Sequence, residues 1–204
     1  MSNDSNNVLK GVFPILATCF KENDEIDYDS QKKLIEFCIN GGVHGLVLLA
    51  NASEGHLLSD QEKRELIVFC TEHIAGRVPV VVTVNHPSAK AAAELARFAE
   101  ARGAAAVMAM PPFFGRWRSG FDEISRFFGY LNDAVQIPII VQDHMLSDIQ
   151  MPVSFLIELA HRWPRVRYMK LESGNINFKA RQLVQANDSP YLGIFGGNSG
   201  VFMP

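Results

Sequence analysis

Short apolar runs alternate with longer amphipathic segments along the whole chain. The short runs contain few polar residues, which is typical of strands buried on both faces of a parallel sheet. The longer segments carry apolar residues at helical spacing, and one of them opens with a capping-box pattern, Ser59 followed by Glu62. The predicted strands are residues 11–18, 45–50, 78–84, 104–110, 137–142, 166–171 and 191–195. The predicted helices are residues 27–40, 59–74, 88–102, 120–134, 152–163 and 178–186.

The order of these elements predicts the fold class. A strand–helix unit repeats along the chain, which indicates an α/β protein with a parallel sheet and helical crossovers. An open doubly wound sheet and a (β/α)8 barrel both fit this order. The barrel is favoured because polar residues follow the strands, where barrel active sites lie, and no Gly-x-Gly-x-x-Gly motif follows the first strand. We therefore predict a (β/α)8 TIM barrel in one domain, residues 11–204, after a polar tail, residues 1–10.

The predicted barrel stops after its seventh strand. A complete barrel usually takes about 250 residues, whereas this chain has 204. Taken literally, we expect a gap between the first and seventh strands, lined by apolar residues such as Phe13 and Ile15. We expect such a gap to hydrate the barrel interior, to make these residues poorly soluble or self-associating, and to leave little activity. A non-catalytic fragment that pairs with a partner is therefore one alternative.

The predicted strand at residues 166–171 carries the candidate chemistry, together with Glu172 directly after it. Successive side chains of a strand point to opposite faces. Met169 and Leu171 should therefore face the helices, and Lys170 and Glu172 should face the interior. A lysine that loses its hydration inside an apolar strand is a side chain that forms Schiff bases with carbonyl substrates. An ordinary ion pair between Lys170 and Glu172 is the alternative.

Composition and charge narrow the class of partner. The chain is 48% hydrophobic and 20% charged, with a net charge of -3, which favours neither nucleic acid nor an anionic membrane. Cys19, Cys38 and Cys70 are odd in number and lack zinc-site spacing, so we predict reduced thiols and a cytoplasmic location. Asp143, His144 and His86 lie near strand ends but are too few to predict a metal site. We predict no cofactor, no signal peptide and no membrane span.

Several short motifs resemble those of the dihydrodipicolinate synthase and N-acetylneuraminate lyase family. They are Gly11-Val12-Phe13-Pro14, Gly45-Leu46-Val47, Asn51-Ala52-Ser53-Glu54, Met110-Pro111-Pro112-Phe113, Pro138-Ile139-Ile140-Val141, Met169-Lys170 and Gly197-Asn198. Members of that family are (β/α)8 barrels, often tetrameric, whose Schiff-base lysine lies on the sixth strand. The resemblance implies that Lys170 is this lysine. It also implies a small 2-keto acid as the partner and a homo-oligomeric assembly.

Three positions depart from the pattern of the synthases and lyases in this family. The proton-relay tyrosine at the end of the fifth strand is replaced by Gln142, and the hydroxyl pair that holds the substrate carboxylate is replaced by Asn51-Ala52. The second relay tyrosine falls at Pro112-Phe113. A glutamine has no titratable group and cannot relay a proton as a phenol does. The resemblance therefore argues against synthase activity.

One branch of the family, which dehydrates L-2-keto-3-deoxyarabonate, is similar at these same places. The shared motifs include Leu49-Ala50-Asn51-x-Ser53-Glu54, Ile137-Pro138-Ile139-Ile140-x-Gln142-Asp143 and Tyr168-x-Lys170-x-Glu172. The resemblance implies a Schiff-base hydro-lyase that acts on a 2-keto-3-deoxy sugar acid. An aldolase or synthase acting on pyruvate-derived 2-keto acids is the alternative.

The resemblance and the strand pattern together suggest a role for each site residue. Lys170 would attack the C2 carbonyl, Glu172 would transfer the proton, and Gln142 would position a water or a substrate hydroxyl. The implied substrate-binding residues are Thr18, Asn51, Ala52, Ser53, Gly197 and Asn198. Purely structural roles are the alternative for some of these residues: Gln142 as a polar core residue, and Asn51 and Asn198 as turn residues.

Overall fold

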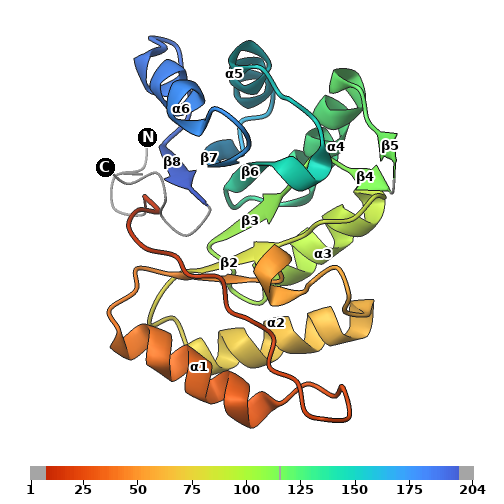
Figure 1. Cartoon of the computed structure of the whole chain (residues 1–204), viewed down its shortest axis with the longest axis vertical. Coiled ribbons are helices and arrows are strands. Elements are labelled where there is room, and N and C mark those ends of the chain that lie inside the picture. The colour runs from red at the N-terminus through yellow and green to blue at the C-terminus, as the bar shows by residue number, and fades with distance from the viewer. Residues whose placement is uncertain (1–7, 115, 198–204) are drawn as a thin grey trace.

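The computed structural model describes residues 8–114 and 116–197 as a curved parallel sheet with helices on its outer side (Figure 1). In sheet order the strands are β1 (Leu46–Leu48), β2 (Val80–Thr83), β3 (Ala106–Ala109), β6 (Ile139–His144), β7 (Val166–Glu172) and β8 (Gly193–Gly196). Each strand pairs in parallel with the next. The order of the strands in the sheet is their order in the chain, as in a barrel that winds in one direction. The sheet is an arc of a (β/α)8 barrel, which confirms the predicted fold class.

Helices connect the strands and follow one another around the outside of the arc (Figure 1). They are α1 (Tyr28–Asn40), α2 (Asp60–Ile74), α3 (Ala89–Ala101), α4 (Phe121–Ala134), α5 (Val153–Arg162) and α6 (Ile176–Gln185). The capping box predicted at the start of α2 is present. The Ser59 N–H donates to the Glu62 carboxylate at 2.8 Å, and the Glu62 N–H donates to the Ser59 hydroxyl at 3.3 Å. These six helices lie within two residues of their predicted bounds.

Side chains of the sheet alternate between two apolar layers. The outer layer lies under the helices and includes Met169 and Leu171 of β7. The inner layer, here called the inner cluster, consists of Leu9, Val47, Ala50, Val81, Ala106, Met108, Ile140 and Tyr168. Tyr168 of the inner cluster is separated from Lys170 by one residue, so both side chains point toward the interior of the arc. The faces predicted for β7 are therefore confirmed.

The predicted first strand, residues 11–18, forms only an isolated parallel bridge between Ile15 and Val47. The Val47 N–H donates to the Pro14 carbonyl at 3.0 Å, and the Leu16 N–H donates to the Val47 carbonyl at 2.9 Å. Pro14 has no N–H to extend the ladder, and β1 is itself only three residues long. The segment lies beside β1, where a first strand would lie, but the prediction of a regular strand there is wrong.

The N-terminal segment also contacts the other end of the arc. The Leu9 N–H donates to the hydroxyl of the buried Tyr168 at 3.0 Å. The rings of Phe13 and Phe195, on β8, meet edge to face with their centroids 5.4 Å apart. The side chain of Lys170 is only 12% exposed. The expectation that an incomplete ring hydrates this lysine is therefore not met.

A short antiparallel hairpin between β3 and α4 was absent from the sequence prediction. Its strands are β4 (Phe113–Phe114) and β5 (Trp117–Arg118). The run Pro111-Pro112 lies between the end of β3 and the hairpin, where proline cannot extend the ladder. The side chains of Phe114 and Trp117 are exposed. No helix within the described ranges is long and apolar enough to cross a lipid bilayer.

Candidate active site

Three predicted catalytic side chains meet on the inner face of β6 and β7. Gln142 of β6 is the ladder partner of Lys170, and Glu172 lies two residues further along β7. Because parallel strands end at the same edge of the sheet, this register brings the three side chains to the carboxyl end of the arc. The strand pattern thus places Lys170, Glu172 and Gln142 together, as the sequence predicted for Lys170 and Glu172 from their shared face.

These three side chains are in direct contact. Lys170 Nζ lies 3.0 Å from Glu172 Oε2, and Gln142 Nε2 donates to the same oxygen at 2.6 Å. The Glu172 side chain is 7% exposed, and Gln142 is buried. Charged side chains so close and so shielded from water interact far more strongly than a surface ion pair. The carboxylate is therefore held in one place, against the group that would act as the nucleophile.

The ion pair with Glu172 still allows Lys170 to act as a nucleophile. Its ammonium makes no well-directed hydrogen bond within the described part of the chain, although it lies in ion-pair range of Glu172. An amine must be neutral to attack a carbonyl. The carboxylate of Glu172 lies beside that amine, where it could accept a proton from a bound substrate. The arrangement can therefore support both the nucleophile and a proton transfer beside it.

Gly197, which the sequence predicted as a substrate-binding residue, lies against Glu172. Its N–H donates to the Leu171 carbonyl at 3.0 Å, which continues the pairing of β7 with β8. A Cβ atom at Gly197 would overlap the side chain of Glu172. Only a glycine therefore leaves room for the carboxylate here. Asn198, predicted beside it, lies outside the described residues.

The predicted substrate-binding residues after β1 lie in a tight turn that contains the short 3-10 helix η2 (Asn51–Ser53). The Thr18 hydroxyl donates to the Ser53 carbonyl at 2.6 Å, and the Ser53 hydroxyl accepts from the Ala50 N–H at 3.2 Å. Both hydroxyls are thus engaged within the protein, which favours a supporting role for them. Ala52 is exposed and could contribute only its backbone.

Asn51 differs from its neighbours because its amide faces the end of β3. Its Nδ2 lies 3.8 Å from Met110 Sδ. Leu49 and Glu54, on either side of the turn, have φ angles of 59° and 55°. Such left-handed conformations cost energy in residues other than glycine, and they are common near functional sites. The strained turn keeps Asn51 half-buried at the carboxyl end of the arc.

Thr83 at the end of β2 is an inward polar residue that the sequence prediction missed. Val81 belongs to the inner cluster, so Thr83, two residues later, faces the same interior. Its hydroxyl is buried and has no hydrogen-bond partner in the ranges that the structure describes, and the same holds for Gln142 Oε1. Buried polar atoms normally have a partner, either in the protein or in a bound molecule. The sequence feature that could have identified Thr83 is the alternation of inward and outward residues along a strand that is otherwise rich in valine.

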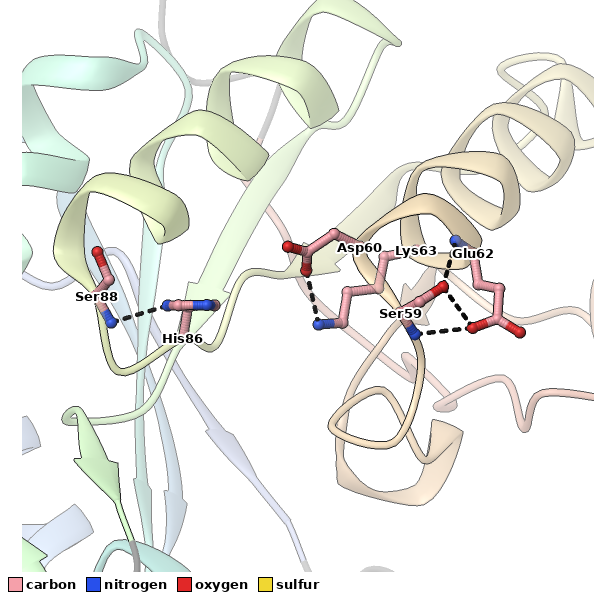
Figure 2. Close-up of polar contacts among 6 residues, drawn as sticks. All are labelled: Ser59, Asp60, Glu62, Lys63, His86 and Ser88. Atoms are coloured by element: carbon pink, nitrogen blue, oxygen red, sulfur yellow. Dashed lines mark hydrogen bonds and ion pairs between the residues drawn. The ribbon is translucent and has the colours of Figure 1, made fainter.

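A hollow between α2 and α3 contains other polar residues from a strand end. It is lined by Asp60, Lys63, Arg64, Asn85, His86, Ala91, Glu94 and Leu95. Figure 2 shows Asp60 and Lys63 paired at 3.2 Å, and His86 accepting the Ser88 N–H through Nδ1 at 2.8 Å. The Asn85 side chain accepts the Met110 N–H at 2.8 Å. None of Lys170, Glu172 and Gln142 lines this hollow.

The carboxylate of Asp143 is turned away from Gln142, toward α6. It forms an ion pair with Lys179 at 2.6 Å and accepts a hydrogen bond from the Ser173 hydroxyl. His144 Nδ1 accepts the Leu146 N–H at 2.9 Å. Among the residues that the structure describes, no three His, Cys, Asp or Glu side chains are grouped so that they could hold a metal ion.

Comparisons with known proteins assign the chain to a family. The sequence profile of the dihydrodipicolinate synthetase family matches residues 8–204. The match covers nearly the whole chain and includes Lys170, Glu172 and Gln142. The chain belongs to the dihydrodipicolinate synthetase family.

Individual relatives agree with this assignment. An L-2-keto-3-deoxyarabonate dehydratase from Azospirillum brasilense is 36% identical over 202 residues, covering 98% of this chain and 65% of the relative. A 4-hydroxy-tetrahydrodipicolinate synthase from Bartonella bacilliformis is 31% identical over 176 residues, covering 86% and 59%. A crystal structure of dihydrodipicolinate synthase from Aquifex aeolicus has the same fold, with a TM-score of 0.85 at 22% identity over 94% of this chain and 64% of that one. The chain spans less than two thirds of the length of each of these relatives.

Proposed function

We propose that this chain carries the Schiff-base site of a hydro-lyase that dehydrates a 2-keto-3-deoxy sugar acid. The observation that carries the proposal is the contact of Lys170 with Glu172, which Gln142 holds from the neighbouring strand. This site joins a nucleophilic amine to one proton-transfer group and contains no phenol among the three side chains. The 36% identity to the Azospirillum brasilense dehydratase supports a substrate such as L-2-keto-3-deoxyarabonate.

The proposed reaction uses one lysine and one carboxylate. The neutral amine of Lys170 attacks the C2 carbonyl of the substrate, a proton from solvent converts the departing C2 oxygen to water, and the resulting iminium ion draws electrons from C3. Glu172 removes a C3 proton, and the electron pair left behind forms the new C3–C4 double bond as the C4 hydroxyl departs. Glu172 returns its proton to that hydroxyl, so that water leaves. A second water then hydrolyses the imine and frees Lys170.

Gln142 has a positioning role in this scheme. Its amide donates to the Oε2 atom of Glu172 that also contacts Lys170. The hydrogen bond to the amide directs this oxygen, but an amide cannot itself take up or release the proton. The buried Oε1 of Gln142 has no partner among the described residues and is available to a water or a substrate hydroxyl.

The second candidate function is aldol cleavage or synthase chemistry on a pyruvate-derived 2-keto acid. The match to 4-hydroxy-tetrahydrodipicolinate synthases favours it. Gln142 and Pro112-Phe113 stand where the resemblance places relay tyrosines, and none of these residues has a titratable group. We therefore expect no useful condensation of pyruvate with aspartate semialdehyde by the protein. Rapid condensation in a coupled assay would contradict this expectation.

Product analysis separates the two candidates. The protein is incubated with 2-keto-3-deoxy-L-arabonate, and the products are identified by mass spectrometry and NMR. Dehydration gives a five-carbon product that has lost one water, whereas aldol cleavage gives pyruvate and glycolaldehyde. We expect the dehydrated product, and we expect none from the variant Lys170→Met. Pyruvate and glycolaldehyde as the products would reject the dehydratase proposal.

A partner, an assembly and a cellular location are also proposed. We infer a small-molecule 2-keto acid as the partner, a homo-oligomer as the assembly and the cytoplasm as the location. The three cysteines, Cys19, Cys38 and Cys70, are free thiols, which supports a reducing compartment. The exposed aromatic side chains of Phe114 and Trp117 on the hairpin support association with another copy. Sedimentation of the purified protein tests the assembly, and a monomer at all concentrations would reject it.

A further inference from the structure

A second polar cluster lies directly behind the candidate active site, on the outer face of the sheet. It consists of Asp143 on β6, Ser173 after β7 and Lys179 on α6, which are 0%, 3% and 9% exposed. Lys179 Nζ lies 2.6 Å from Asp143 Oδ2 and donates to Ser173 Oγ at 3.0 Å. The Ser173 hydroxyl donates to the same carboxylate oxygen. We call these three residues the rear triad.

The burial of the rear triad is not explained by stability alone. Removing an ammonium and a carboxylate from water is costly, and apolar residues of similar volume often stabilise a core as well or better. Lys179 occupies a core-facing position of α6, between the buried Ile176 and Leu183. A helix that packs on a sheet normally has an apolar residue at such a position. The charged residues therefore need another explanation.

The position of the rear triad in the sequence suggests an explanation for its buried charges. Asp143 follows Gln142, and Ser173 follows Glu172. Since successive side chains of a strand point to opposite faces, one peptide joins each outer residue to an inner one. The outer contact of Ser173 with Asp143 therefore lies directly behind the inner hydrogen bond from Gln142 to Glu172.

The pairing of the two strands ends at the same place. The last ladder pair of β6 and β7 joins His144 to Glu172. The residue that follows β7, Ser173, is bonded back to Asp143 of β6 through its hydroxyl. Lys179 then connects both strand ends to the first turns of α6. The rear triad thus fixes the spacing of the two strand ends that carry Gln142 and Glu172.

We propose that Asp143 and Lys179 are positioning residues for the reaction: through the rear triad they hold the Glu172 carboxylate in line with Lys170. This inference rests on the proposed function, because it assigns Glu172 the proton transfer. A small displacement of a catalytic group can lower a rate by as much as about 100-fold. Loss of the rear triad should therefore slow proton transfer at C3 while leaving formation of the imine intact.

Two measurements with pyruvate separate these steps. Borohydride trapping reports the imine at Lys170, and exchange of the pyruvate methyl protons for deuterium, followed by NMR, reports proton transfer from C3. In Asp143→Asn we expect trapping within about twofold of the unsubstituted protein and exchange slowed at least about tenfold. In Ser173→Ala, which keeps the ion pair, we expect a smaller loss of exchange.

A double variant distinguishes loss of positioning from misfolding. Asp143→Leu combined with Lys179→Met replaces the buried pair by apolar side chains of similar volume, so it should fold with a thermal midpoint near that of the unsubstituted protein. We expect its exchange to be as slow as that of Asp143→Asn. As a matched control, Arg77→Gln breaks an ion pair between α1 and the segment after α2 and should leave exchange unchanged.

The outcomes are distinguishable. Normal exchange in the folded double variant would overturn the positioning role of the rear triad. Trapping that falls in proportion to exchange would also overturn it, because the defect would then lie at Lys170 rather than at Glu172. Absence of trapping or of exchange in the unsubstituted protein would instead reject the proposed function itself.

Discussion

At the scale of single residues, the proposed chemistry depends on one oxygen atom. Oε2 of Glu172 lies 3.0 Å from the Lys170 ammonium and accepts a hydrogen bond from the Gln142 amide at 2.6 Å. Lys170 and Glu172 share a face because they are two residues apart on β7, and Gln142 reaches them because β6 pairs with β7 in register. The proposed proton acceptor is therefore fixed beside the proposed nucleophile before any substrate binds, which would lower the cost of orientation.

Gly197 should be intolerant of any side chain. In Gly197→Ala the new methyl group overlaps Glu172, so the carboxylate must move or the strand must shift. We expect a loss of stability of about 1–3 kcal/mol from overpacking and a fall in deuterium exchange of at least about tenfold. Urea unfolding and NMR exchange measure the two effects.

Gly174 provides the matched control for this substitution. It lies after the end of β7, and a Cβ atom there meets no other atom within 4 Å. Gly174→Ala should therefore leave exchange unchanged. Equal rates for the two alanine variants would show that contact with Gly197 does not set the position of Glu172.

Thr83 should affect ligand binding more than stability. Thr83→Val keeps the shape of the side chain and removes a buried hydroxyl that has no partner among the described residues. Removing such a group should stabilise the fold by up to about 1 kcal/mol. If the hydroxyl binds the 2-keto acid, half-maximal trapping should require roughly five- to tenfold more pyruvate. An unchanged pyruvate requirement would leave Thr83 no part in binding.

At the scale of elements, α1 and α2 are joined by an ion network at the surface. Glu36 of α1 accepts two hydrogen bonds from the Arg77 guanidinium, at 2.7 and 2.9 Å, and lies 2.8 Å from His73 Nε2 on α2. The hydrogen bonds from Arg77, with a smaller contribution from His73, lower the pKa of Glu36 to about 2. The folded protein therefore binds a proton at Glu36 less readily than the unfolded chain does.

This network predicts a loss of stability in acid. Because the folded pKa of Glu36 lies below its ordinary value of 4.5, the contribution is complete above pH 4.5 and disappears as the pH falls toward about 2. Urea unfolding of the protein and of Glu36→Gln, compared at about pH 7 and about pH 3, measures it. We expect the difference between the two proteins to shrink at the lower pH. A constant difference would show that the carboxylate charge makes no contribution.

The elements themselves were largely predictable, because the periods of two and 3.6 in apolar residues reflect burial directly. The hairpin at Phe113–Phe114 and Trp117–Arg118 was missed because strands of two residues are too short to show a period. The first strand was overpredicted because its apolar pattern is real while Pro14 and the short β1 limit its hydrogen bonding. The pairing of distant segments cannot be predicted from the sequence pattern of either segment alone.

The site was predictable in part. Lys170 and Glu172 followed from strand alternation, and the resemblance added Gln142, whose contact with Glu172 the structure supplies. Lys179 was missed, although a lysine spaced among apolar residues of a helix was a usable signal. The hydrogen bonds of the Thr18 and Ser53 hydroxyls were not predictable from the sequence. Their hydrogen bonds depend on the local turn, which the sequence pattern does not specify.

At the scale of the whole molecule, the sheet arc brings together side chains that are distant in the chain. Strand order and pairing place Thr83, Gln142, Lys170 and Gly197 around one interior. Leu9 and Phe13 of the N-terminal segment contact Tyr168 and Phe195 at the other end of the arc. The candidate catalytic cluster is therefore assembled and shielded within the residues described here.

In the proposed reaction Lys170 forms a Schiff base with a 2-keto acid, and borohydride trapping detects this covalent bond. The protein is incubated with pyruvate, reduced, digested and mapped by mass spectrometry, with Lys170→Met as the control. We predict one adduct, on the peptide that contains Lys170, and no adduct in the control. An adduct on another lysine, or none at all in the folded protein, would contradict the account.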